Sequence, residues 1–278
     1  MDLIDTHQHL ILRDHLGYAW TAGIPALATA DFTRADYAWL TAGRGVVGTI
    51  FMETGVDDAD YQAEARLVAG MVGSSGMLGQ IASIRPEEDA GFDAWLEEAR
   101  QLKTVGFRRI LHVVPDEVST TETFRRNLRK IGKAGLPFDL NFLSRQLEPV
   151  GVPLLRACPD QVFILDHCGV PDVVAGDWEI WEAGVRAFAG FENVVVKLSG
   201  ITAYAAPGAG VDVIRPYVER LLELFGPQRM LWGSDWPVVD LGAGLPGWIG
   251  MTGELLAGLS AAERAAIGTG TARRVYGV

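Results

Sequence analysis

The chain has 278 residues, of which 49% are hydrophobic and 21% charged, and 24 Lys and Arg against 35 Asp and Glu give a formal net charge of −11. This composition is typical of a soluble globular protein and excludes a disordered tail, and the length suits one domain with a full core. The acidic balance disfavours nucleic acid and anionic membranes as partners. A small molecule is therefore the expected ligand.

The start of the chain shows no targeting pattern, because Met1 is followed by an acidic rather than a basic segment. No stretch approaches the run of about 18 apolar residues that a membrane span needs. The cytoplasm is the expected location, and Cys158 and Cys168 fit that reducing compartment as free thiols without metal-binding spacing. The oligomeric state stays open, and a homo-oligomer is compatible with the sequence.

Short apolar or β-branched runs alternate with segments of helical spacing along the whole chain. Runs without strict alternation are typical of parallel strands that are buried on both faces. The predicted strands are 2–9, 46–53, 78–84, 107–113, 137–143, 162–168, 194–200 and 229–235. The predicted helices are 33–42, 58–72, 88–103, 124–134, 145–157, 178–190, 211–225 and 260–275.

Capping and turn residues mark where some of these predicted elements begin and end. Residues 119–122 (STTE) read as a capping box before the helix 124–134. The Gly- and Pro-rich stretches near 207–210 and 242–250 are predicted to be loop insertions. Eight strands alternating with helices favour an α/β fold, a distorted single-domain TIM (β/α)8 barrel over residues 1–278, with a doubly wound open sheet as the alternative.

Two histidines end the first predicted strand. Because side chains alternate along a strand, His7 and His9 project from the same face, about 6–7 Å apart at the backbone. That separation lets both rings approach one atom or ion. An H-x-H pair taken alone is weak evidence, since two core histidines can share this spacing by chance.

Three further segments end predicted strands with polar groups, at the edge where barrel enzymes keep their active sites. They are 164–169 with His167, 232–237 with Asp235, and 52–55 with Glu53. Burying such a group has a desolvation cost unless a partner or an ion offsets it. A hydrogen-bonded core histidine and a helix-capping or turn aspartate are the structural alternatives for His167 and Asp235.

Taken together, these motifs resemble the amidohydrolase superfamily. The motifs are IDTHQH at 4–9, LDHCG at 165–169, VKLSG at 196–200, LWGSDWP at 231–237 and TARRVYG at 271–277. More narrowly, the chain resembles the amidohydrolase-2 group, which contains L-fuconolactonase, L-rhamnonolactonase and 2-pyrone-4,6-dicarboxylate lactonase. The resemblance covers essentially the whole chain and implies that His7, His9, His167 and Asp235 converge at the C-terminal mouth of a barrel.

The resemblance also indicates how many metal ions the site is expected to hold. Binuclear members of the superfamily use a carboxylated Lys on the fourth strand and a His on the fifth. Here the fourth strand offers Arg108, Arg109 and His112, and the fifth offers Asp139 and Asn141. The resemblance therefore implies at most one divalent cation, expected to be Zn²⁺, with His7, His9, His167 and Asp235 as its ligands. Because the pyrone lactonase of this group works without metal, metal-independent catalysis stays an alternative.

The implied reaction is hydrolysis of a small cyclic ester, a sugar-acid lactone such as an L-fucono- or L-rhamnonolactone. Asp235 is the predicted general base, while His7, His9 and His167 polarise the carbonyl directly or through the metal. The residues predicted to contact the substrate are Arg108, His112, Glu53, Asn141 and Trp236. For Arg108, a structural ion pair is the alternative.

Two other functions remain open from the sequence. A nonoxidative, metal-dependent decarboxylase of the same superfamily would use the same H-x-H, later His and last-strand Asp. A non-catalytic scaffold would hold a structural metal, but structural zinc sites are usually closed and rich in Cys. Val170 stands where related lactonases often carry Lys, so the identity of the lactone does not transfer.

Overall fold

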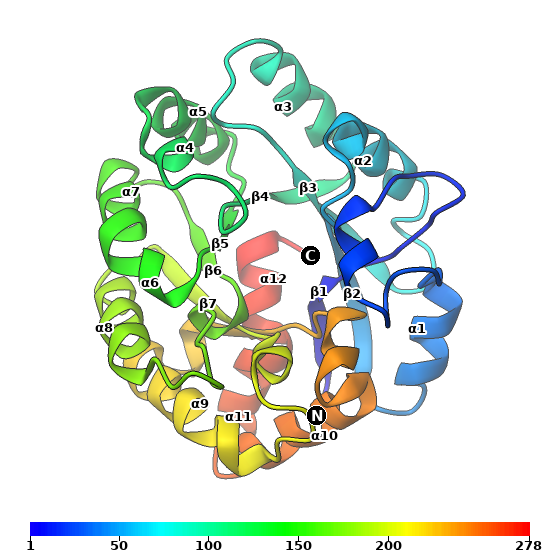
Figure 1. The fold of residues 1–278 in the computed structure, drawn as a ribbon, viewed down its shortest axis with the longest axis vertical. Coiled ribbons are helices and arrows are strands. Elements are labelled where there is room, and N and C mark those ends of the chain that lie inside the picture. Colours follow the sequence, from blue (N-terminus) through cyan, green and yellow to red (C-terminus); the bar gives the residue numbers. More distant parts are fainter.

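The computed structural model describes residues 1–278 and contains one sheet of eight parallel strands in the order β1 to β8. The sheet closes on itself, because Asp235 N donates to His7 O and His9 N donates to Trp236 O, both at 2.9 Å. Helices surround it (Figure 1). The predicted TIM barrel is confirmed. The strands are β1 (Leu3–Gln8), β2 (Val46–Met52), β3 (Met77–Ser83), β4 (Thr104–Ile110), β5 (Phe138–Asn141), β6 (Phe163–Leu165), β7 (Val194–Leu198) and β8 (Met230–Trp232).

Twelve α-helical segments accompany the strands, and none is long and apolar enough to cross a membrane. Two π-helical turns, Leu147–Gly151 and Ala266–Gly270, join α6 to α7 and α11 to α12. The helices are α1 (Arg34–Thr41), α2 (Tyr61–Ala69), α3 (Phe92–Gln101), α4 (Glu117–Thr120), α5 (Glu122–Lys133), α6 (Ser144–Gln146), α7 (Val152–Ala157), α8 (Trp178–Ala189), α9 (Val211–Phe225), α10 (Gly244–Leu255), α11 (Ala261–Ala265) and α12 (Thr271–Tyr276).

Three local predictions are wrong. The fourth strand, predicted at 107–113, begins at Thr104 and ends at Ile110, so its last predicted residues lie in a loop. Residues 119–122 are not a capping box, since Glu117–Thr120 form α4 and Thr121 alone caps α5 by accepting from Phe124 N. The stretch 242–250 lies mostly in α10, because packing of its buried face outweighs the low helix propensity of its glycines.

The interior of the barrel is apolar towards its N-terminal end and charged towards its C-terminal end. Its lower half is an apolar cluster that joins side chains of β1, β2, β3, β6, β7 and β8 to Ala272 and Tyr276 of α12. Helix α12 therefore covers the N-terminal end of the barrel. Above this cluster the inward-facing positions carry charge, among them Asp139 of β5 and Lys197 of β7. The fold thus places its polar side chains towards the C-terminal mouth.

One buried carboxyl outside the mouth makes stability depend on pH. Glu64 of α2 is 2% exposed, and its Oε1 accepts a hydrogen bond from Thr54 N at 2.9 Å. Burial, followed by the charge of Glu53, raises the pKa of Glu64 to about 8. Between the unfolded value of about 4.3 and that pKa, the folded state holds the proton more tightly, so the free energy of unfolding falls as pH rises.

Glu64→Gln is expected to remove this contribution, since the amide oxygen still accepts from Thr54 N but does not titrate. Thermal unfolding of both proteins between about pH 5 and pH 8 measures the effect. The advantage of the Gln variant over the wild type should grow with pH. Parallel curves for the two proteins would contradict the prediction.

Candidate active site

The four side chains predicted at three strand ends, His7 and His9 at the first of them, meet at the C-terminal mouth. His7 Nε2 and His9 Nε2 lie 3.6 Å and 3.4 Å from Asp235 Oδ1, and His167 Nδ1 lies 3.8 Å from Asp235 Oδ2. The His7 ring centroid is 4.8 Å from that of His9 and 4.4 Å from that of His167. All four residues are buried. One carboxylate therefore faces three imidazoles.

The donor atoms of His7, His9 and Asp235 fit one divalent cation. They lie within 4.8 Å of one another, and a tetrahedral zinc with ligands at about 2.1 Å would separate its ligands by about 3.4 Å. His9 Nδ1 donates to Met52 O at 3.0 Å, which leaves the Nε2 lone pair free for a ligand. The fourth predicted ligand, His167, belongs instead to a second group with His7 and Asp166.

The backbone at these positions is held in an uncommon conformation. Asp235 has φ 61° and His167 has φ 52°, both in the left-handed region that L residues rarely adopt. The glycine of the VKLSG motif permits their approach, because a Cβ on Gly200 would lie 2.5 Å from His167 Nδ1 and 3.1 Å from Asp235 Oδ2. The motif glycine is therefore required by the site.

Beneath the histidines lies a buried charge network formed by Lys197, Asp139, Asp166 and Tyr276. Lys197 Nζ contacts the Asp139 carboxylate and lies 3.0 Å from Asp166 Oδ1 and 3.3 Å from His7 Nδ1. The Tyr276 hydroxyl donates to Asp139. All of these charged side chains are fully buried. The network therefore ties the lower side of His7 to three strands.

Burial and these charges set the protonation of the site. Burial lowers the pKa of His7 well below its usual value, although Asp166 opposes the shift. Burial also lowers the pKa of His167, against the charge of Asp235. Burial would raise the pKa of Asp166, but the charge of Lys197 holds it well below its usual range. Both imidazoles are therefore neutral at pH 7 and offer lone pairs.

Arg108 and Glu53 form one buried pair at the edge of this cluster. Arg108 Nε donates to Glu53 Oε1 at 2.6 Å, and Arg108 Nη2 donates to the Glu53 carbonyl at the same distance. Arg108 Nη1 also lies 3.1 Å from His7 Nε2. Glu53 thus holds Arg108 against the His7 ring and belongs to none of the groups that could hold a metal.

A cavity of about 320 Å³ opens above the cluster and brings together most of the predicted substrate contacts. Besides Arg108 and Glu53, His112 and Asn141 line it, and both present a buried polar atom without a partner, His112 Nδ1 and Asn141 Oδ1. Burial lowers the pKa of His112. The Asn141 side chain also lies close enough to His112 to influence its pKa, so the two residues form one polar part of the cavity wall. Trp20 lines the same cavity with a partly exposed ring.

The predicted contact from Trp236 is not supported by its position. Trp236 is 1% exposed and does not line the cavity. Its ring packs edge-on against Phe32 and Tyr37, with centroids 5.6 Å and 5.5 Å away. The residue is part of the hydrophobic core. Proximity in sequence to a site residue did not predict the direction of the ring.

Sequence reasoning gave no role to three other groups in the cavity wall. Arg85 pairs with Asp58, Nη2 to Oδ1 at 2.7 Å, and Arg109 pairs with Glu87 at 2.8 Å. Tyr204 follows β7, and its ring centroid lies 6.2 Å from that of His167. Arg109 follows Arg108 near the end of β4, and both arginines line the cavity.

Comparison with known proteins gives consistent matches. The amidohydrolase family model matches residues 4–278. An L-fucono-1,5-lactonase of Burkholderia multivorans is 27% identical over 98% of this chain and 95% of its own length. A 4-sulfomuconolactone hydrolase of Rhizobium radiobacter is 30% identical over 50% of this chain and 47% of its own. A crystal structure of a Burkholderia multivorans amidohydrolase with bound zinc has a TM-score of 0.89, with 26% identity and full coverage of both chains.

Proposed function

Because this chain belongs to the amidohydrolase family, we propose that it is a lactone hydrolase that opens a neutral sugar-acid lactone. The observation that carries the proposal is one carboxylate, Asp235, facing three histidines beneath a cavity lined by polar side chains. The relatives named lactonase or lactone hydrolase support the reaction class.

The charges of the cavity favour a neutral substrate over an anionic one. Three arginines line it, yet Arg108, Arg85 and Arg109 are each paired with a carboxylate. A sulfonate or a second carboxylate on the substrate would need a cation whose charge is not already matched. Paired Arg and Asp or Glu side chains instead offer alternating donors and acceptors, which suit the hydroxyls of a sugar ring.

The residues of the chain can supply the remaining steps. Asp235 accepts a proton from the attacking water, since it is the carboxylate that faces the imidazoles. The ring of His9 and the neutral ring of His167 form hydrogen bonds around the ester group. Arg108, which lines the cavity and keeps its proton, donates a hydrogen bond to the carbonyl oxygen as the ester is attacked. Each group lies at the cavity or directly beneath it.

A metal at this site would be held by His7, His9 and Asp235, the donor set that fits one divalent cation. When bound, a zinc ion polarises a carbonyl and lowers the pKa of a bound water. The zinc found in the related crystal structure supports this assignment.

Tyr204 is proposed to donate a proton to the departing alkoxide. Burial raises the pKa of its phenol, so the hydroxyl keeps its proton at the cavity wall. Tyr204→Phe is expected to lower kcat about 10²-fold for aliphatic lactones, whose alkoxide leaves poorly. The loss should be smaller for an aryl lactone such as dihydrocoumarin. Tyr217→Phe, a buried tyrosine that packs against Trp178 and Trp181 away from the cavity, is the control.

The reaction is tested by a pH-indicator assay with L-fucono-, L-rhamnono- and D-gluconolactone, a pyrone dicarboxylate and benzoate-type acids, with and without chelator. Acid release from neutral sugar lactones supports the proposal. Hydrolysis of the anionic pyrone alone would contradict the substrate class. Release of CO₂ without acid production would replace the lactonase with a decarboxylase. Metal analysis of the same sample relates any loss with chelator to a bound ion.

A further inference from the structure

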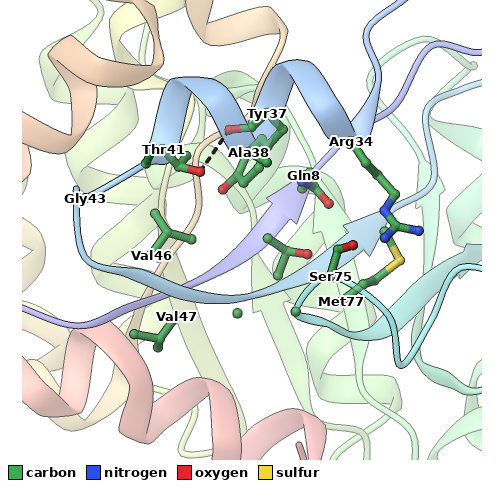
Figure 2. Close-up of a pocket in the computed structure, with 14 residues that line it drawn as sticks. Gln8, Arg34, Tyr37, Ala38, Thr41, Gly43, Val46, Val47, Ser75 and Met77 are labelled. Carbon is green, nitrogen blue, oxygen red and sulfur yellow. Dashed lines mark hydrogen bonds between the residues drawn. The ribbon is translucent and has the colours of Figure 1, made fainter.

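A second cavity, of about 280 Å³, lies on the outside of the barrel, under α1 and against β2 and β3 (Figure 2). Its roof is the helix from Arg34 to Thr41, and its floor is the start of β2 and of β3. Gln8 reaches it from β1. It shares no lining residue with the active-site cavity. The two cavities are therefore separate.

Arg34 is the one charged residue that lines this cavity. The ion pairs formed by the other arginines of the chain do not include it. Figure 2 shows its guanidinium reaching from α1 towards Ser75 and Met77. In a protein with a net charge of −11, an unpaired guanidinium in a recess without any carboxylate favours an anion.

Gln8 provides a second, independent indication that this cavity binds a ligand. The residue is 2% exposed, and its Oε1 has no hydrogen-bond partner. A buried carbonyl without a partner is destabilising, and a hydrogen-bond donor would relieve that destabilisation. Figure 2 shows the Gln8 amide between α1 and the strands, on the cavity side. The cavity is thus lined by a cation at one point and, at another, by the Gln8 amide, whose oxygen has no partner.

We propose that this cavity binds a small hydroxycarboxylate. The carboxylate accepts from Arg34 and from the Ser75 hydroxyl, while a hydroxyl of the ligand donates to Gln8 Oε1. The volume lies just below the range of about 300–1,000 Å³ that is usual for drug-sized ligands, which suits a molecule of monosaccharide size. Binding here does not depend on the reaction proposed for the active site.

Methionine methyl NMR provides a local test, because Met77 lines this cavity and is one of six methionines in the chain. In protein labelled at its Met methyl groups, D-gluconate should shift the Met77 signal saturably, and Met77→Leu identifies that signal. Met251 of α10 should not move. Sorbitol, without the charge, and propionate, without the hydroxyls, should each bind at least about ten-fold more weakly.

Two variants and one control decide the location. Arg34→Gln removes the charge and Ala38→Met fills the space, so each should abolish the Met77 shift with gluconate. Arg44→Gln, an exposed arginine that donates to Leu40 O outside the cavity, should keep it. No saturable Met77 shift in the wild type, or an unchanged shift in Arg34→Gln, would overturn the proposal. Equal affinities for gluconate and sorbitol, or for gluconate and propionate, would also overturn it.

Discussion

Asp235→Asn is expected to lower kcat for lactone opening by about 10³-fold or more. The carboxylate oxygens face His7, His9 and His167 at 3.4–3.8 Å, and an amide at this position neither accepts a proton from water nor carries charge. The steady-state rate with the best sugar lactone from the substrate screen measures the loss. A kcat within about ten-fold of the wild type would remove Asp235 from the role of general base.

Folding of the variant is checked separately, because Asp235 has a left-handed backbone that asparagine also tolerates. Thermal unfolding should therefore change little. Asp240→Asn is the matched control on the same loop, since the Asp240 side chain is outside the cavity and accepts from Leu245 N at the start of α10. It should keep its turnover. A loss as large as that of Asp235→Asn would trace the effect to the loop rather than to the carboxylate.

The sequence predicted the features that follow from local residue patterns. Strand periodicity placed His7 and His9 on one face, and the polar ends of buried runs located His167, Asp235 and Glu53 before any contact was known. Their meeting follows from barrel topology, because parallel strands end at one rim. The four residues that carry the site were therefore accessible to sequence reasoning once the fold class was chosen.

What the sequence did not predict depends on packing between distant segments. Trp236 turns into the core against Phe32 and Tyr37, and α10 forms from a Gly-rich stretch because Trp248 and Leu245 are buried. Tyr204 enters the cavity from a short 3₁₀ turn that has no periodic pattern. These side-chain directions and local conformations are determined by tertiary contacts, which outweigh local propensity.

The contacts of Lys197 also could not be predicted from the local sequence, and replacing this residue is expected to have a large effect on stability. It lies within the VKLSG motif, yet nothing local reveals that its partners come from β5 and from the end of β6. Lys197→Met is expected to lower the free energy of unfolding by about 3–5 kcal/mol, because Asp139 and Asp166 lose the cation that compensates them. Chemical denaturation of the variant measures the loss.

Two comparisons separate this effect from the loss of any ion pair. Lys130→Met removes an exposed pair with Asp93 and should cost less than about 1 kcal/mol. Adding Asp139→Asn to Lys197→Met should recover part of the stability, since one of the two uncompensated carboxylates is then neutral. If the double variant is no more stable than Lys197→Met, the loss stems from packing around the lysine stem. Recovery would instead show that charge compensation under His7 is what the lysine contributes.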